Sequence, residues 1–303
     1  MLSIGFDPSF IDTLVRVQNG NSLATHLPLP GNHHRDSFIQ RIAGGNGVNV
    51  SYVLSKIDIP HTLVVPVNQE FEMLLKQRGI INFYSINADI SETVALTYSK
   101  GDIQFNHQRS VLNRIHWSKE IHDLWVNSPI AIFLNWGLNI DSLEWVSLQW
   151  LSICGWNFDE LLSERDLFSH ALEMNCPSKP IILEPGSIKT HHSKDNLTKL
   201  LTNMSKSEIT DKLIFCCNEE EVSEYRTINF PNFVLHTSKF VELIGSEEKL
   251  VDVPKLRREP ETFVGAGDAF LAGMISSVLK DEIDLDYCIK VAQTYLLNDY
   301  SDN

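Results

Sequence analysis

The sequence feature that most constrains this fold is an alternation of short apolar segments with segments of helical periodicity. Within residues 48–57, apolar side chains recur at a helical spacing, and a β-branched segment follows. Strands that alternate with helices indicate βαβ units, in which a mostly parallel sheet carries helices on both faces. We therefore expect an α/β fold. The segments expected to form strands of its sheet are 2–6, 61–67, 82–87, 130–134, 179–183, 212–217 and 233–236.

Two β-rich regions do not fit this alternation. Residues 13–42 carry loosely alternating polar and apolar segments with prolines and a glycine, which favours edge strands and turns over helix. Residues 92–99 and 103–107 flank Lys100-Gly101-Asp102, a hairpin-turn sequence. We predict that the regions at about 13–42 and 92–108 form a small β lid attached to the main sheet. Residues 1–303 are then expected to form a single domain.

Composition narrows the class of function. The chain has 25 basic and 39 acidic side chains, which give a formal net charge of −14. This balance argues against nucleic acid or an anionic membrane as a partner, although backbone N–H groups can still bind phosphate. No apolar run reaches membrane-spanning length, the N-terminus lacks a signal-peptide pattern, and the five cysteines include no C-x-x-C pair. We therefore expect reduced thiols and a cytoplasmic protein.

A glycine-rich turn leads into a helix near the end of the chain. Gly265 and Gly267 flank Ala266 and let the backbone approach a ligand closely. The N-terminus of the following helix offers free N–H groups and a positive dipole end, which suits a phosphate. Asp268 lies in the first helical turn, where it can cap the helix or act as a general base for a hydroxyl.

A second glycine-rich segment opens an earlier helix. It contains Gly44, Gly45 and Gly47, with Asn46 and Asn49 three residues apart, so that both amides can face one cleft. The alternative is a plain glycine turn with an Asn cap. The spacing is not the G-x-G-x-x-G of dinucleotide-binding proteins, which argues against an NAD-dependent enzyme.

A third segment follows the strand expected at 212–217. Asn218 and Glu221 are three residues apart and share one face if a helix begins at Asn218. One interpretation is Asn capping, with acidic residues that complement the helix dipole. The other is an outer-shell site for Mg²⁺ and its waters beside phosphates.

Together, the three segments resemble the signatures of the ribokinase-like sugar kinases, also called the phosphofructokinase-B type. Residues 44–49 are similar to the family's first signature, a glycine pair followed by a substrate-binding Asn. Residues 264–273 are similar to its second signature, and Asn218 with Glu221 matches the Asn-x-x-Glu motif between them. The order of the motifs extends the resemblance over nearly the whole chain.

The resemblance implies a three-layer α/β/α sandwich with a mostly parallel central sheet and a small β lid that closes over the acceptor. It implies transfer of the terminal phosphoryl group of a nucleotide to a hydroxyl of a sugar, sugar phosphate or nucleoside. The implied donor is ATP or ADP with Mg²⁺. Lids of this family often pair across two copies, so a homodimer through the lid is implied as well.

The resemblance also assigns roles to residues. Asp268 is the implied catalytic base, and the N–H groups of Gly265, Ala266 and Gly267 are the implied stabilisers of the transferring phosphoryl group. An Asp that follows the first strand is implied to bind acceptor hydroxyls, and Asp12 is preferred over Asp7 for this role. The implied acceptor-binding residues are thus Asp12, Gly44, Gly45 and Asn49; the nucleotide-binding residues are Asn218, Thr237, Gly265 and Gly267; Glu221 and Asn218 place Mg²⁺ through water.

Two departures from the family's pattern concern the nucleotide. Thr262, Phe263 and Val264 stand where the second signature usually has Asp-Thr-Thr. A hairpin that usually reads Thr-x-Gly-x-x-Gly begins here at Thr237 and contains no glycine up to Glu242. These changes support an alternative from another class, a catalytically silent protein that binds a sugar or a nucleotide on the same fold.

Overall fold

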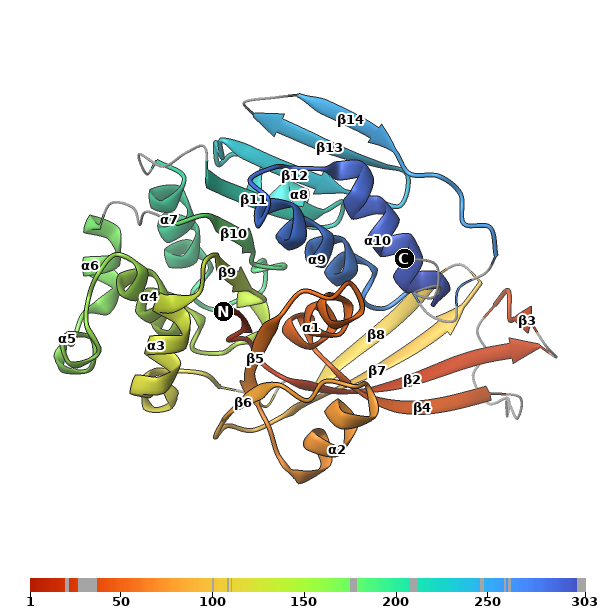
Figure 1. The fold of residues 1–303 in the computed structure, drawn as a ribbon, viewed down its shortest axis with the longest axis horizontal. Helices are drawn as coiled ribbons and strands as arrows, with labels where there is room; N and C mark the ends of the chain where they lie inside the picture. Colours follow the sequence, from red (N-terminus) through yellow and green to blue (C-terminus); the bar gives the residue numbers. More distant parts are fainter. Residues whose placement is uncertain are drawn as a thin grey trace.

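The apolar runs form the strands of two hydrogen-bonded sheets in the computed structural model of the chain (Figure 1). The structure describes residues 1–19, 22–26, 37–99, 101–107, 109, 111–174, 179–206, 212–245, 248–258, 260 and 263–298. The strands of these two sheets are β1 (Leu2–Gly5), β5 (His61–Pro66), β6 (Phe83–Ile86), β9 (Ala131–Leu134), β10 (Ile181–Glu184), β11 (Leu213–Asn218), β12 (Asn232–His236), β13 (Phe240–Gly245) and β14 (Lys249–Asp252).

The order of the strands confirms a mostly parallel α/β architecture. One sheet has the order β1-β5-β6 and the other the order β14-β13-β12-β11-β10-β9. All pairs from β9 to β12 are parallel, as are those of the three-stranded sheet. β1 lies beside β9, where the backbone N–H of Ser3 donates to the Ser128 hydroxyl over 3.1 Å. The antiparallel strands β13 and β14 extend the sheet at its far edge, and neither was expected from the sequence.

Most helices lie between successive strands, as the alternation predicts, and the last ones follow the final strand. Helix α1 nearly coincides with the helical segment expected at 48–57. Most connections between parallel strands contain a helix. The α-helices are α1 (Asn46–Lys56), α2 (Gln69–Gln77), α3 (Lys119–Asn127), α4 (Ser142–Ile153), α5 (Phe158–Ser163), α6 (Leu167–Glu173), α7 (Lys194–Met204), α8 (Val222–Tyr225), α9 (Ala266–Val278) and α10 (Leu285–Leu297).

Two hydrophobic clusters place helices on both faces of the sheets. The first joins α1, α2, α9 and α10 to one face, and the second joins α3 to α8 to the other. Neighbouring residues of a strand point to opposite faces, so β10 contributes Ile182 to the first cluster and Ile181 and Leu183 to the second. Strands buried on both faces read as continuous apolar runs, which is why the sequence revealed them.

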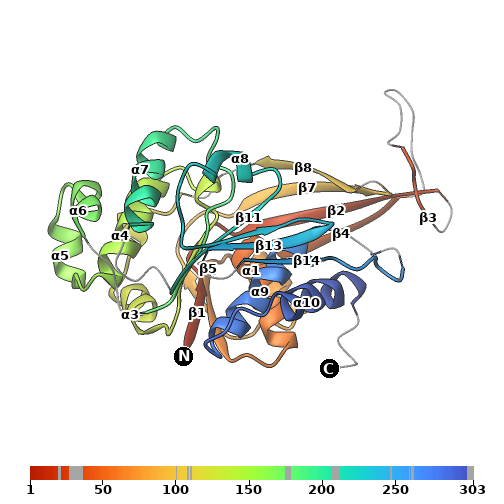
Figure 2. The same cartoon turned by 90° about the horizontal axis from the view of Figure 1, so that it is seen from above.

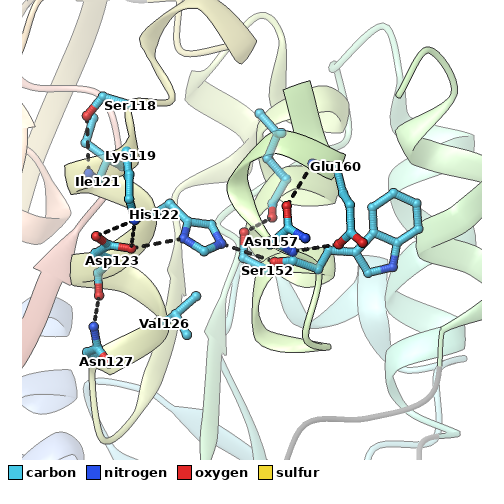
Figure 3. Close-up of polar contacts among 12 residues, drawn as sticks. Ser118, Lys119, Ile121, His122, Asp123, Val126, Asn127, Ser152, Asn157 and Glu160 are labelled. Atoms are coloured by element: carbon cyan, nitrogen blue, oxygen red, sulfur yellow. Dashed lines mark hydrogen bonds and ion pairs between the residues drawn. The ribbon is translucent and has the colours of Figure 1, made fainter. Parts of the chain in front are cut away.

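A set of polar contacts fixes α3 against the turn between α4 and α5 (Figure 3). Ser118 caps α3 by accepting from the N–H of Ile121 over 3.3 Å. His122 donates from Nε2 to the backbone carbonyl of Trp156 over 3.1 Å. Asn157 and Glu160 then form a reciprocal capping box at the start of α5. These contacts join α3 to the start of α5.

A separate five-stranded sheet contains both β-rich regions that did not fit the alternation. Its strands are β2 (Phe10–Asn19), β3 (Ser22–Leu23), β4 (Ser37–Gly44), β7 (Ser91–Tyr98) and β8 (Gly101–His107). β2 pairs with β4, β3 and β7, and β7 pairs with β8 in an antiparallel hairpin. Figure 2 shows this small sheet extending away from the helices. The predicted turn includes residue 100, and the predicted lid includes 27–36; both lie outside the described residues.

Within the part of the chain that the structure describes, no helix has the length and apolar character needed to cross a membrane.

Candidate active site

A cavity of about 240 Å³ lies between the base of the small sheet, the carboxyl ends of the parallel strands and the N-terminus of α9. Open α/β sheets bind ligands at this edge because the loops that follow parallel strands converge there. The cavity brings together all three sequence motifs. Its lining includes Phe10, Asp12, Gly45, Asn46, Asn49, Thr93, Gln104, Asn106, Asn135, Glu184, Asn218, Glu221, His236, Phe263, Val264, Gly265, Ala266, Gly267 and Asp268.

The turn before α9 has the backbone conformation that its glycine predicts. Gly265 caps the helix with φ of 85°, in the left-handed region. A Cβ on this residue would lie 2.5 Å from the hydroxyl oxygen of Tyr295. The N–H of Ala266 donates to the carbonyl of Phe263 over 3.3 Å, so one of the three N–H groups predicted to bind phosphate is engaged within the turn. The first helical turn still presents N–H groups that have no partner inside the helix.

Asp268 occupies the first turn of α9 and faces the cavity. It does not cap the helix, because Gly265 is the cap residue. The side-chain N–H of Asn49 donates to Oδ2 of Asp268 over 2.8 Å. Burial raises the pKa of Asp268 to about 8, and the nearby carboxyl of Glu184 acts in the same direction, whereas the Asn49 bond opposes them. A carboxyl whose pKa lies near the pH at which a reaction takes place can both accept and release a proton during that reaction.

Asn49 is nearly fully buried, with 4% of its surface exposed, and both ends of its amide are engaged. Its Nδ2 faces Asp268, and its Oδ1 accepts from Nη1 of Arg78 over 2.8 Å. Asn capping does not explain this segment, because α1 is capped by Gly45 without a side-chain hydrogen bond. The sequence analysis gave no reason to single out Arg78, which ends a helix 29 residues further along the chain.

Asp12 lies on β2 at the base of the small sheet and is 4% exposed. Burial raises its pKa to about 7, although the charge of Arg78 and a hydrogen bond from Thr93 both act to lower it. Gly44 does not line the cavity, but its lack of a side chain leaves room for the Asp12 carboxyl. A Cβ on Gly44 would lie 1.7 Å from Oδ2 of Asp12. Asp7, the alternative to Asp12, is not among the lining residues and accepts from the N–H of Gly47 over 3.2 Å.

Asn218 and Glu221 both line the cavity, but they lie in a turn and not on a shared helix face. Strand β11 ends at Asn218 and α8 begins only at Val222, so the condition for a shared helix face, a helix that begins at Asn218, is not met. Oδ1 of Asn218 accepts from the N–H groups of Glu220 and Glu221, and Oε2 of Glu221 accepts from the N–H of Asn218. These reciprocal bonds satisfy the backbone of the turn.

Two cavity residues, Glu184 and His236, were missed by the sequence analysis. Each stands at the carboxyl end of a strand, and Oε1 of Glu184 lies 3.7 Å from Nε2 of His236. Burial, reinforced by the charge of Glu221, raises the pKa of Glu184 well above its usual value. Burial lowers the pKa of His236 to about 4. The only sequence signal for either residue is its position directly after an apolar strand.

Thr237 is not among the lining residues, unlike its neighbour His236. The Thr237 hydroxyl accepts from the N–H groups of Lys239 and Phe240 and donates to the carbonyl of Phe240. It therefore stabilises the tight turn between β12 and β13. The predicted nucleotide contact of Thr237 stays a prediction.

The residues present fit a hydrated divalent ion better than a directly ligated one. Among the described residues, no group of three or more His, Cys, Asp or Glu side chains is placed to hold a metal ion. Glu184 has a buried Oε2 without a hydrogen-bond partner in the described structure, and Glu221 lies close enough to raise its pKa. Carboxylate oxygens of this kind accept hydrogen bonds from the waters that Mg²⁺ retains.

No family model matches the chain, and no curated protein matches it by sequence. Solved structures do match. Phosphofructokinase-2 from Escherichia coli superposes with a TM-score of 0.64 at 12% identity, over 98% of this chain and 92% of its own. An uncharacterised sugar kinase from Pyrococcus horikoshii, solved with ATP, gives 0.64 at 17% identity, over 100% and 92%. Arabidopsis thaliana ribokinase with ribose and ATP gives 0.59 at 15% identity, over 97% and 89%.

These similarities extend over nearly the full length of both partners in each comparison. At this level of sequence identity they establish the fold and not the reaction. The chain therefore has the ribokinase-like fold of the phosphofructokinase-B type sugar kinases, as its three motifs indicated.

Proposed function

We propose that this protein is a small-molecule kinase that transfers the terminal phosphoryl group of a nucleotide to a hydroxyl of a sugar-like acceptor. The observation that carries the proposal is the position of Asp268. It lies in the first turn of α9, beside the Gly265 turn, and shares a cavity with the buried Asp12 of the small sheet. A base, an anion-binding helix end and a hydroxyl-binding carboxylate thus converge in one small space.

In the proposed reaction, Asp12 accepts a hydrogen bond from one acceptor hydroxyl and orients the acceptor. Asp268 takes the proton of the reacting hydroxyl as that oxygen attacks the terminal phosphorus. The bond from this phosphorus to the bridging oxygen breaks, and the nucleotide leaves with one phosphate fewer. Asn49 already occupies Oδ2 of Asp268, which leaves Oδ1 to receive the proton. The N–H groups at the start of α9 stabilise the charge on the transferring phosphoryl group.

The donor we propose is ATP with Mg²⁺. Two of the structural neighbours were solved with ATP, which supports this choice. Bound Mg²⁺ would neutralise charge on the donor phosphates, and Glu184, Asn218 and Glu221 are the residues that would hold its waters. His236 lines the same cavity and is uncharged at neutral pH, because burial lowers its pKa to about 4, so in this proposal it would lie beside the donor phosphates.

The lining of the cavity favours an uncharged, hydroxyl-rich acceptor. Among the described lining residues none is Lys or Arg, whereas several carry amides or hydroxyls. Amides both donate hydrogen bonds to hydroxyl groups and accept them, and carboxylates accept them, whereas a phosphate on the acceptor calls for basic side chains. We therefore place sugars and nucleosides ahead of sugar phosphates. The amide and hydroxyl residues are Asn46, Asn49, Thr93, Gln104, Asn106, Asn135 and Asn218.

The test combines a binding screen with an assay of phosphoryl transfer. ATP and ADP with Mg²⁺ are crossed with pentoses, hexoses, their phosphates and nucleosides, and thermal stabilisation identifies the pair to assay. Asp268→Asn should then lose roughly 10²- to 10⁴-fold in turnover, because that is the usual contribution of a general base. Its acceptor affinity should change only by a small factor. Asp58→Asn, which alters an exposed carboxylate, is the matched control and should keep its turnover.

Retained turnover in Asp268→Asn would contradict the assignment of the base. If both ligands stabilise the protein and no phosphoryl transfer occurs with any pair, the catalytically silent alternative replaces the kinase. The replacement of the usual hydroxyl side chains by Phe263 and Val264 beside the cavity is the feature that would then explain the loss.

The small sheet is the surface through which we propose that two copies pair. The registers place Ile39, Val94 and Phe105 on the face opposite Asp12, and their side chains are 63%, 39% and 59% exposed. Apolar side chains gathered on one face of a sheet are typical of an interface. Sedimentation of wild-type protein should show a dimer that Phe105→Asp dissociates. A wild-type monomer at micromolar concentration would refute the pairing.

A further inference from the structure

Arg78 has a backbone position fixed by the end of α2. The N–H of Gly79 donates to the carbonyl of Lys76 and the N–H of Ile80 donates to that of Leu75, at 2.9 and 3.0 Å. Gly79 has φ of 76°, and these two bonds form a Schellman motif. Leu75 and Ile80 are buried beside each other, as that motif favours. The motif therefore sets where the side chain of Arg78 begins.

The guanidinium of Arg78 is held on two sides. Its Nη1 donates both to the backbone carbonyl of Ala43 and to Oδ1 of Asn49, the latter over 2.8 Å. Its Cζ lies 4.4 Å from the centre of the Tyr52 ring, a cation–π distance. Tyr52 in turn meets the ring of Tyr295 edge-on at 6.2 Å. The contacts of the guanidinium with Ala43 and Tyr52, which do not line the cavity, thus hold Arg78 beside Asn49.

A guanidinium has five N–H donors and no acceptor. The atom of Asn49 that faces Arg78 must therefore be the carbonyl oxygen, and the amide nitrogen must face the other way. On that other side lies Oδ2 of Asp268, at 2.8 Å from Nδ2. A flipped Asn49 would set two donors against each other at Arg78 and, when Asp268 is ionised, two acceptors against each other at Asp268.

We infer that Arg78 is a positioning residue, which acts through the amide of Asn49 to orient Asp268 and to favour its ionised form. The inference rests on the proposed function for its catalytic meaning, but the effect on Asp268 exists in the ligand-free protein. The main role of Asn49 is then to hydrogen-bond the catalytic base Asp268, and binding the acceptor is its secondary role. The hydrogen bonds from Arg78 to Asn49 and from Asn49 to Asp268 thus connect the end of α2 to the start of α9 through the first turn of α1.

Several other groups act on Asp268 and set the background for Arg78. The charges of Glu184 on β10, Asp12 on β2 and Asp7 after β1 oppose ionisation of Asp268, as does its burial, whereas the charge of Arg78 favours it. Tyr295 on α10 also lies within electrostatic reach of Asp268. The positive charge of Arg78 thus acts against the neighbouring carboxyl groups and lowers the pKa of Asp268.

The experiment is a carboxyl-carbon NMR titration of the ligand-free protein with labelled aspartate, in which Asp268→Asn assigns the resonance. Arg78→Met should raise the titration midpoint of Asp268 by about one pH unit, since it removes both a charge and the constraint on Asn49. Arg78→Lys, which keeps a charge and N–H donors, should restore part of the shift. Arg41→Met is the matched control, because Arg41 pairs with Glu70 in an exposed ion pair at 2.8 Å.

A second comparison tests whether Arg78 acts through Asn49. In an Asn49→Leu background, Arg78→Met should shift the midpoint less than in the wild type. Equal shifts in both backgrounds, or equal shifts from Arg78→Met and Arg41→Met, would overturn the inference. Where Arg78→Met does not fold, Arg78→Gln takes its place, because Gln retains length and an amide donor.

Kinetics give a separate readout once an acceptor is known. Arg78→Met should move the acidic limb of the kcat profile to higher pH and leave KM for the acceptor within about threefold. A uniform loss of kcat at every pH, with the limb unmoved, would indicate a merely structural role. If the wild type transfers no phosphoryl group, the proposed function fails while the titration still decides the inference.

Discussion

Asp7 offers the most direct test of the electrostatics in this molecule. It lies just after β1, is 1% exposed, and accepts one hydrogen bond from Gly47. Its Oδ1 has no hydrogen-bond partner among the described residues, although the side chain of Asn135 lies close enough to act on its pKa. Burial and the nearby Asp268 together raise the pKa of Asp7 from 3.8 to about 7. The perturbation we consider is Asp7→Asn, which keeps an acceptor for Gly47 and removes the charge.

The sign of the effect follows from the direction of the shift. Below pH 4 the carboxyl of Asp7 is protonated in both the folded and the unfolded chain, so it carries no penalty. Between about pH 4 and 7 only the unfolded chain releases the proton, and the wild type loses stability as the pH rises. Each unit corresponds to about 1.4 kcal/mol, so the penalty approaches about 4 kcal/mol above pH 7.

The assay is denaturant unfolding of the wild type and of Asp7→Asn between pH 5 and pH 8, without ligands. The stability advantage of Asp7→Asn should grow by about 3 kcal/mol across this range, since about two units of the shift lie above pH 5. Melting temperatures should diverge by roughly 5 °C. The control is Asp58→Asn, at an exposed position. If the free energies of unfolding of Asp7→Asn and the wild type change with pH in parallel, the reasoning is refuted. A carboxyl with an unshifted pKa would not make the stability depend on pH between 5 and 8.

Three further outcomes are expected. Gly44→Ala places a Cβ 1.7 Å from Oδ2 of Asp12. Calorimetry should therefore show acceptor binding weakened at least tenfold, and the free energy of unfolding should fall by about 1–3 kcal/mol. Unchanged acceptor affinity would show that Asp12 does not bind the acceptor. Gly265→Ala meets the Tyr295 hydroxyl at 2.5 Å with φ of 85°, so melts should show destabilisation that Tyr295→Phe partly relieves; no relief would locate the strain in the backbone alone. Because burial raises the pKa of Asp268 to about 8, turnover should increase with pH up to about that value, and a flat profile from pH 6 to 9 would exclude Asp268 as the base.

Much of the fold could be predicted because buried parallel strands and amphipathic helices have distinct periodicities. The runs that became β9, β10 and β11 are apolar on both faces, so they stand out in the sequence. Strands β13 and β14 were missed because they form the antiparallel end of the sheet and contain mixed, partly exposed residues, whose pattern does not differ from that of a loop. A helix that begins at Asn218 was only the condition for a shared face with Glu221. In the structure α8 begins at Val222, and the side chains of Asn218 and Glu221 bind the backbone of the turn before it.

The candidate site divides in the same way. The glycines at 44, 45, 265 and 267 could be recognised because close approach of the backbone requires a residue without a Cβ. Glu184 and His236 could not, because a polar residue at a strand end has many structural explanations in a sequence. Thr237 was proposed from the family's pattern, whereas the structure shows its hydroxyl engaged within its own turn.

The sequence by itself determined what each local segment can do: a Gly-Ala-Gly turn with Asp268, a glycine-rich turn with Asn49, and an α/β alternation to place them. Only the tertiary structure decided that Asn49 faces Asp268 and is oriented by Arg78. The physical reason is that turn and helix chemistry depends on neighbours a few residues away. The orientation of an amide and the pKa of a carboxyl depend on burial and on charges from distant elements, which come together only when the chain is folded.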